Sequence, residues 1–191
     1  HLSIRRQRQM CIRDRISLVD DPRRTPPGRA CRLEVVSGQL TDHYDPRTRT
    51  LRLSQDIFYG RSIAALGVAA HEVGHAIQHA QAYAPLMLRN VVYPVSGFGS
   101  YMAWPLFLLG LFTSYGPLLN LGLLLFAFAV FFTLIALPVE FNASRRALKA
   151  LAQGGYLEED ELTSARRVLS AAAMTYVAAA AMAVLQLVRM L

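Results

Sequence analysis

The feature that most constrains this chain is a long stretch without charge. No Asp, Glu, Lys or Arg occurs in residues 90–139, and a second uncharged stretch covers 168–188. A soluble domain rarely buries uncharged segments of this length, whereas about 20 apolar residues suffice for a helix to cross a bilayer. The hydrophobic content of 53% also excludes a disordered chain. The sequence therefore predicts a mainly α, polytopic membrane protein.

Three segments are long enough to span the membrane as helices. They cover approximately residues 92–112, 117–139 and 168–188. Only the short segment 113–116 separates the first two, which should therefore form an antiparallel pair. The prolines within the first helix are expected to kink it, which lipid surroundings tolerate when neighbours satisfy the backbone. The third segment is rich in alanine, so it either spans the membrane or is buried against the other helices.

The charged residues are distributed unevenly around these segments. The net charge is +7, and the basic residues lie mainly before residue 91 and in 140–167. The turn at 113–116 is uncharged, so the positive-inside rule places both charged regions in the cytoplasm. No basic stripe alternates with aromatic residues. We therefore expect a lipid bilayer, and no nucleic acid, as the partner of this chain.

Residues 1–30 give no sign of a folded element. The first fifteen, HLSIRRQRQMCIRDR, lack helical and strand periodicity and resemble read-through of a sequencing adaptor. We interpret 1–30 as unstructured or non-native. Cys11 and Cys31 form no CxxC pair, which favours thiols in a reducing compartment over a disulfide scaffold.

A small β element and a capped helix are predicted next. The segments CRLEVV (31–36) and TLRLS (50–54) alternate apolar and polar residues, and a loop with Gly and Pro joins them, so we expect a β-hairpin. Its second strand is expected at the sheet edge, where an extended peptide can pair with it. Ser62 is the expected N-cap of a helix that runs to residue 80. Gly67 and Gly74 lower the propensity of that helix but permit close packing.

His71, Glu72 and His75 form an HExxH motif on this predicted helix. Two histidines four residues apart project from one helix face and can bind the same metal ion; the alternative is a pair of solvated or capping histidines. Zinc at a catalytic site usually has three protein ligands and one open position for water. Glu72 would be the general base for that water. We therefore expect one zinc ion per chain.

Glu140 is the stronger candidate for the third ligand. It is the first charged residue after the uncharged run, at the expected cytoplasmic end of the second membrane helix. An ionisable group there is costly without a partner, and the alternative to a metal is an ion pair with Arg145 or Arg146. His79 continues the face of the two histidines. Three histidines on successive turns of one straight helix cannot easily surround an ion, so a surface position or a supporting contact is expected for His79.

The motif belongs to a longer pattern. HEVGHAIQH is preceded by TDHYDPRTRTLRLS and RSIAALGVAA and is followed by LPVEFNASRRALKAL. Over about residues 35–191 the chain resembles membrane-bound neutral zinc metallopeptidases of the YugP type. It is more distantly similar to HtpX-type and CaaX prenyl proteases, in which a Glu on a later helix completes the zinc shell. The resemblance implies a bacterial, gluzincin-like membrane peptidase with His71, His75 and Glu140 as zinc ligands and Glu72 as the base.

Departures from these families lie close to Glu140. The HtpX-like pattern has an Asp where this chain has Ser144, which would weaken a carboxylate contact to a ligand histidine. Asn142 stands where YugP-type relatives have Asp. Those relatives also begin with a membrane helix, so the resemblance implies a fourth, N-terminal helix that is missing from this sequence.

Other polar residues are weaker candidates for the site. His43 or Tyr44, in the polar segment TDHYD, would donate to a tetrahedral oxyanion in one interpretation. In the other, the segment is an Asx-turn with a satisfied histidine. Arg145 would orient the zinc ligands or bind a carbonyl, and the alternative is a structural ion pair.

These observations together predict a membrane-embedded zinc endopeptidase of the cytoplasmic membrane, with its site on the cytoplasmic side. Its substrates would be proteins or peptides, membrane proteins among them. Its parts would be 31–90 (hairpin and HExxH helix), 91–139 (two transmembrane helices), 140–167 (third-ligand helix and cytoplasmic loop) and 168–191 (C-terminal helix). Two alternatives remain: a catalytically silent zinc-binding scaffold and a zinc hydrolase of a non-peptide amide. Glu72 argues against the scaffold, because a structural zinc site has no use for that carboxylate.

Overall fold

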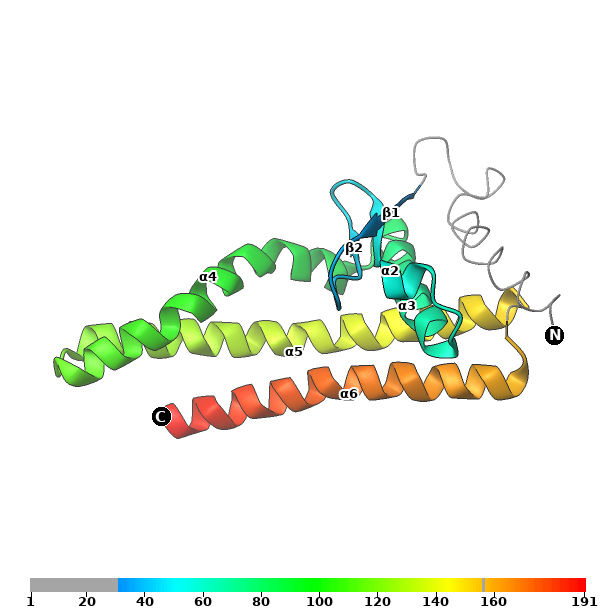
Figure 1. Ribbon diagram of the computed structural model, residues 1–191. Coiled ribbons are helices and arrows are strands. Elements are labelled where there is room, and N and C mark those ends of the chain that lie inside the picture. Colours follow the sequence, from blue (N-terminus) through cyan, green and yellow to red (C-terminus); the bar gives the residue numbers. More distant parts are fainter. Residues whose placement is uncertain (1–30, 156) are drawn as a thin grey trace. The chain divides into compact units, whose positions relative to one another are not determined.

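A computed structural model describes residues 31–155 and 157–191, so the predictions made for 1–30 lie outside the described residues. The prediction of a mainly helical protein with a small β element is confirmed (Figure 1). The elements follow in the order β1 (Arg32–Val36), β2 (His43–Asp45), β3 (Thr50–Ser54), α2 (Gln55–Phe58), α3 (Ile63–Ala80), α4 (Ala84–Phe112), α5 (Gly116–Gln153) and α6 (Glu159–Met190).

The described chain divides into two compact units. The first unit combines the chain up to Tyr83, with the sheet, α2 and α3, with Phe141–Ala172. The second unit combines Ala84–Glu140 with Ala173–Leu191. The long helices α5 and α6 therefore each contribute residues to both units.

The sheet has three strands in the order β1–β3–β2. β1 pairs with β3 in parallel, with Val35 opposite Leu53, and β2 pairs with β3 antiparallel, with Tyr44 opposite Leu51. The two segments expected to form a hairpin are thus parallel neighbours, because the chain between them supplies β2, which itself forms the hairpin with β3. The strand expected at the sheet edge, β3, is the central one, and β2 is an edge strand.

Two aspartates of the polar segment before β3 hold the sheet together. Asp42 accepts hydrogen bonds from the N–H and the hydroxyl of Ser54, at 2.7 and 3.2 Å. Asp45 accepts from Arg52 Nη1 and Thr48 Oγ1, both at 2.8 Å. The hydrogen bond from Arg52 holds the pKa of Asp45 below its usual range. These two acids therefore serve the fold.

Helix α3 begins at the predicted cap, where Ser62 Oγ accepts a hydrogen bond from the N–H of Ala65 at 3.0 Å. Its small apolar residues pack in two directions within the first unit. On one side Ala69 joins a cluster that contains Leu51 and Leu53 of β3. On the other side a second cluster joins α3 to α5 and α6, through Leu66, Ala70, Ala147, Leu151, Ala165 and Leu169. Helix α3 therefore packs against the sheet through one apolar cluster and against these parts of α5 and α6 through another.

The backbones of α3 and α5 approach closely at Gly74. A Cβ atom added there would lie 2.3 Å from the carbonyl oxygen of Ala143. A Cβ added to Gly67 would meet only Leu169 Cγ, at an ordinary 3.9 Å. Backbone-to-backbone contact of this kind requires a residue without a side chain. The close packing predicted for the glycines of this helix is confirmed at Gly74.

In the second unit, α4 and α5 form an antiparallel pair joined by the short turn predicted at 113–116. Glycines bring the two helices together at two levels. A Cβ on Gly110 would lie 2.3 Å from the backbone of Leu119, and one on Gly122 would lie 2.5 Å from the backbone of Phe107. The contact positions rise on one helix as they fall on the other, as an antiparallel arrangement requires.

Three helices, α4, α5 and α6, are long and apolar enough to cross a membrane. Large apolar side chains stay exposed on each of them, including Phe98 at 68%, Leu124 at 66% and Leu185 at 62% exposure. An apolar surface of this extent is unfavourable in water and suits a lipid environment. Pro94 and Pro105 lie within α4, which bends along its length in Figure 1, as the sequence predicts.

Alanine substitution at the two glycines of α3 tests the contact with α5. We expect Gly74→Ala to lower the free energy of unfolding by about 1–3 kcal/mol, because the added methyl overpacks a backbone contact. Gly67→Ala is the matched control and should be neutral or stabilising by up to about 1 kcal/mol, through helix propensity. Thermal unfolding in detergent measures both. Equal stability of the Gly74→Ala protein and the wild type would contradict this packing.

Candidate metal centre

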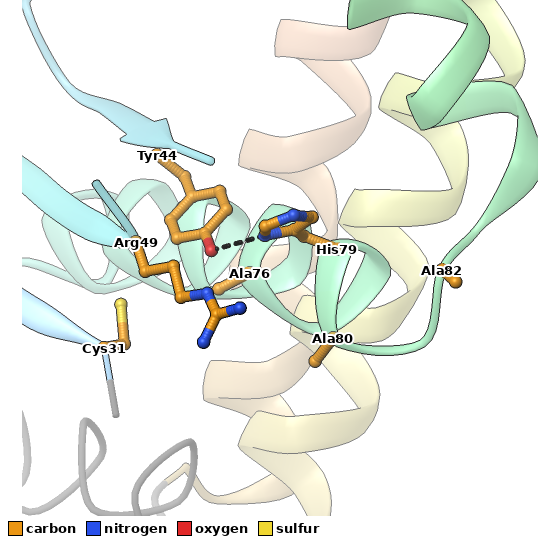
Figure 2. A pocket seen from close by; sticks show the side chains of 7 residues that line it. All are labelled: Cys31, Tyr44, Arg49, Ala76, His79, Ala80 and Ala82. Atoms are coloured by element: carbon orange, nitrogen blue, oxygen red, sulfur yellow. Dashed lines mark hydrogen bonds between the residues drawn. The ribbon is translucent and has the colours of Figure 1, made fainter. Parts of the chain in front are cut away.

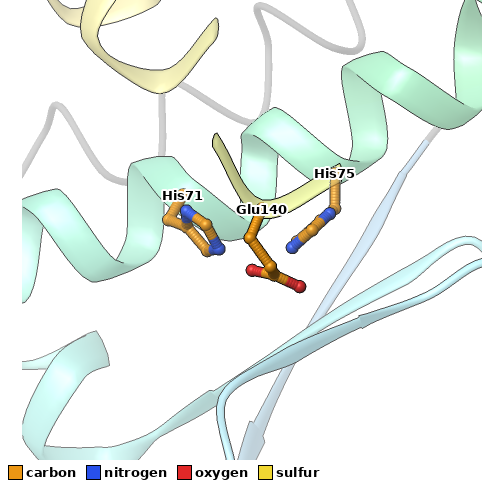
Figure 3. Close-up of side chains that lie close together, drawn as sticks. All are labelled: His71, His75 and Glu140. Atoms are coloured by element: carbon orange, nitrogen blue, oxygen red, sulfur yellow. The ribbon is translucent and has the colours of Figure 1, made fainter. Parts of the chain in front are cut away.

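Helices α3 and α5 bring three possible metal ligands together. His71, His75 and Glu140 each offer one ligand atom, and these atoms all lie within 4.8 Å of one another (Figure 3). The Glu140 carboxylate points between the two imidazole rings, whose centroids are 4.8 Å apart. Glu140 lies three residues before Ala143 on the uninterrupted helix α5. The contact of Ala143 with Gly74 therefore also determines where this carboxylate lies.

The donor set of this group fits zinc. Two imidazole nitrogens and a carboxylate oxygen are common zinc ligands, and three protein ligands leave the fourth position open. Donor atoms at 2.0–2.2 Å from a tetrahedral zinc lie about 3.4 Å apart. The three ligand atoms now lie within 4.8 Å of one another. Small rotations of the side chains would bring them to the spacing that zinc requires.

The second ring nitrogen of each histidine has an uncharged partner. His71 Nδ1 lies 3.1 Å from Ser144 Oγ, and His75 Nδ1 lies 3.0 Å from Gln78 Oε1. These contacts engage Nδ1 of each ring, so a metal would bind at Nε2. Ser144, which replaces the Asp of the HtpX-like pattern, thus still contacts a candidate ligand histidine, but through a hydroxyl.

Glu140 is buried, with 2% exposure, and forms an ion pair with Arg89 on α4. Arg89 Nη1 lies 3.1 Å from Glu140 Oε1. The sequence indicated Arg145 or Arg146 as ion-pair partners of Glu140. They follow Glu140 by five and six residues, whereas side chains that meet on a helix are three or four residues apart. Arg145 is exposed, and Arg146 contacts Asn142 instead. The ion pair is compatible with a metal ligand, because a carboxylate has two oxygens.

Glu72 lies on α3 beside the first histidine and is nearly buried, with 9% exposure. Its Oε2 accepts a hydrogen bond from the backbone N–H of Tyr44 at 3.0 Å. Tyr44 belongs to the edge strand β2. The sheet edge therefore fixes the orientation of this carboxylate next to the candidate ligands.

The Tyr44 side chain engages His79, with the hydroxyl 2.8 Å from Nδ1 (Figure 2). Both residues line a cavity of about 170 Å³, together with Cys31, Arg49, Ala76, Ala80 and Ala82. Burial lowers the pKa of His79 and raises the pKa of Tyr44 to about 12. Both groups are therefore neutral at pH 7. Among the described residues, the group of possible ligands does not include His79.

The remaining sequence candidates lie at exposed positions. His43 Nδ1 contacts the carbonyl of Thr41 at 2.7 Å, and Arg145 faces solvent. Two residues that the sequence analysis did not propose contact the candidate ligands directly, namely Gln78 and Arg89. Gln78 follows His75 by three residues, so helical spacing could have indicated it. Arg89 gives no such signal, because it lies on a different helix from Glu140.

Comparison with known proteins assigns the chain that carries these residues to a family. The family described as "Putative neutral zinc metallopeptidase" matches residues 29–191, which include the HExxH motif and Glu140. The chain belongs to this family. The relative named "Putative membrane protease YugP", from Bacillus subtilis (strain 168), is 51% identical over 157 residues, which cover 82% of this chain and 70% of the relative. No solved structure matches the chain.

Membership in this family confirms the resemblance predicted from the sequence. It also agrees with the donor set, because the His–His–Glu group lies inside the region that the family shares. The family and the donor set thus both indicate a zinc site.

We expect about one zinc per chain in the wild type and almost none after Glu140→Gln, which keeps the size of the side chain but loses the anionic donor. Elemental mass spectrometry of detergent-purified protein measures the ratio. His71→Ala is the positive comparison, and Glu159→Ala, at an exposed position on α6, is the matched control. Full zinc content in the Glu140→Gln protein would remove this residue from the ligand set.

Proposed function

We propose that this protein is a membrane-embedded, zinc-dependent endopeptidase that uses Glu72 as its general base. The observation that carries the proposal is a group of three possible zinc ligands, together with the nearly buried Glu72 that follows His71 on the same helix. Membership in a zinc metallopeptidase family supports the reaction class. The name of the Bacillus relative, a membrane protease, supports the location.

The proposed mechanism gives each residue a separate role. His71, His75 and Glu140 would hold one zinc ion, which when bound would polarise a carbonyl and lower the pKa of a water towards about 7. Glu72 takes the proton of the attacking water and later gives it to the leaving amine. The Tyr44 N–H, at 3.0 Å from Oε2, keeps the Glu72 carboxylate oriented while its proton is gained and lost.

The edge strand β2 supports a peptide as the substrate. An extended peptide can add to a sheet edge, and the three-residue strand β2 lies at the edge that contacts Glu72. A peptide bound along β2 would place its backbone next to the base. His43, exposed on the same strand, and Arg145 are candidates for contacts to a substrate carbonyl. Substrates would include membrane proteins, because the ligand Glu140 ends an uncharged, membrane-length segment.

The charge pattern supports a site at the cytoplasmic face of the bacterial inner membrane. The segments before residue 90 and in 140–167 hold most of the basic residues, whereas the turn at 113–116 is uncharged. By the positive-inside rule the turn lies outside and the candidate metal centre lies on the cytoplasmic side.

Substitution of the proposed base tests the enzyme hypothesis. Glu72→Gln should lower peptide hydrolysis by about 10²–10⁴-fold, because the amide cannot accept the proton, and should leave the zinc content unchanged. The assay is mass spectrometry of a mixed peptide library after incubation with zinc-loaded protein. Cleavage by the Glu72→Gln protein at the wild-type rate would contradict the proposed role of Glu72.

The same assay separates the two alternatives. Zinc-loaded wild type that cleaves no peptide but hydrolyses small amides supports a non-peptide hydrolase. Zinc-loaded wild type that does neither, with full biological function in the Glu72→Gln strain, supports a scaffold.

Reporter fusions test the orientation. Alkaline phosphatase inserted at residues 114–116 should be active, because the enzyme requires export, and a green fluorescent protein inserted there should be dark. The same reporters inserted at residue 155 should give the reverse pattern. Fluorescence from the turn would reverse the orientation.

A further inference from the structure

We infer that Gln78, Asn142 and Arg146 form a directional chain of hydrogen bonds that fixes the tautomer of His75 and so makes it the pre-oriented ligand of the metal centre. The inference rests on the proposed function, since it assigns positioning residues to the same site. Gln78 belongs to α3, and Asn142 and Arg146 belong to α5, all within the first unit.

The direction of the chain is set at Arg146. A guanidinium group donates hydrogen bonds and cannot accept them. Arg146 Nε donates to Asn142 Oδ1 at 2.6 Å, and its Nη1 donates to Gln81 Oε1. The guanidinium also lies 5.6 Å from the centroid of the Tyr83 ring. These contacts hold Arg146 in place, and Asn142 must therefore turn its oxygen, and not its nitrogen, towards it.

The direction passes from Asn142 to Gln78. Gln78 Nε2 donates to the same Oδ1 atom at 3.0 Å. If the Gln78 amide were flipped, two oxygens would face each other at that distance. The nitrogen of Gln78 is therefore committed to Asn142, and its oxygen faces His75 Nδ1 at 3.0 Å. Gln78 is 0% exposed, so bulk water does not compete for these groups.

The last hydrogen bond of this series determines which nitrogen of His75 carries the proton. An amide oxygen only accepts, so His75 Nδ1 must carry the hydrogen, and the lone pair of the neutral ring lies on Nε2. A lone pair on this nitrogen is what a metal needs. In the other tautomer, two acceptors would meet at 3.0 Å and an N–H would point towards the other ligands. The fold thus selects the metal-binding tautomer through contacts that involve no metal.

The two candidate ligand histidines differ in this respect. The partner of His71 is the Ser144 hydroxyl, which can either donate or accept. Ser144 therefore orients the His71 ring without choosing its tautomer. His75 is the candidate ligand whose tautomer is fixed before a metal binds. Asn142 is a positioning residue that acts on His75 through Gln78.

Zinc affinity in a double-mutant cycle tests this chain. We expect Gln78→Leu to weaken zinc binding by about 10–100-fold, measured by competition with a chelator. Asn142→Leu should weaken it by a smaller factor, because Gln78 is then free to flip. The double variant should be no weaker than Gln78→Leu alone, since Asn142 acts only through Gln78. Asn142→Asp keeps the acceptor oxygen and is the matched control, with wild-type affinity expected. Independent, multiplicative losses in the double variant would overturn the inference.

Nuclear magnetic resonance of the metal-free protein gives a readout that does not depend on zinc. With ¹⁵N-labelled histidine, His75 should show a protonated Nδ1 in the wild type and in Asn142→Asp, and a mixture of tautomers in Asn142→Leu. A protonated Nε2 in the wild type, or the same Nδ1-protonated spectrum in all variants, would overturn the role of the chain. A wild type that binds no zinc but shows the expected tautomer pattern would refute the proposed function and leave the hydrogen-bond chain supported.

Discussion

The contact between the backbones of α3 and α5 at Gly74 is the constraint on which the candidate metal centre depends. The hydrogen bonds from His71 to Ser144 and from Gln78 to Asn142 link the HExxH helix to the Glu140 helix across this short distance. Hydrogen bonds in proteins have donor–acceptor distances of about 2.7–3.2 Å, so a displacement by the width of one methyl group would break both of these bonds. The glycine within HEVGH is therefore as much a part of the site as the histidines on either side of it.

Helix α5 is long enough both to span a membrane and to supply a residue to the candidate metal centre. Its 38 residues correspond to about 57 Å at 1.5 Å per residue, which is nearly twice the thickness of a bilayer core. The uncharged part has the length of a span, and the polar part begins at Glu140 and runs on with Asn142, Ser144 and Arg146. Since the helix is continuous, the residue that ends the apolar run is held in register with the residues that contact α3.

Sequence reasoning works where a feature is encoded locally. The HExxH spacing is visible because two residues four apart share a helix face, and the end of the uncharged run makes Glu140 conspicuous. It fails for the sheet, because β2 is a three-residue strand with too few positions to show an alternating pattern, and its insertion turns the expected hairpin into a parallel pair. Arg89 was not predictable, because its contact with Glu140 depends on how α4 packs against α5. Gln78 lies between these cases: its spacing from His75 is local, but its function depends on Asn142 of another helix.

The uncharged partners of the two histidines are explained by the charges already in the site. Glu72 and Glu140 are both nearly buried carboxylates, and Arg89 is paired with Glu140. Each buried charge costs several kcal/mol in desolvation unless a partner compensates for it. A carboxylate in place of the Ser144 hydroxyl, as in the HtpX-like pattern, would add a third negative group to the metal-free protein. Orienting the imidazoles with a hydroxyl and an amide avoids that cost, and the amide obtains its direction from Arg146, whose charge lies farther along α5. The uncharged partners of the two histidines are thus consistent with a site that is assembled before its metal binds.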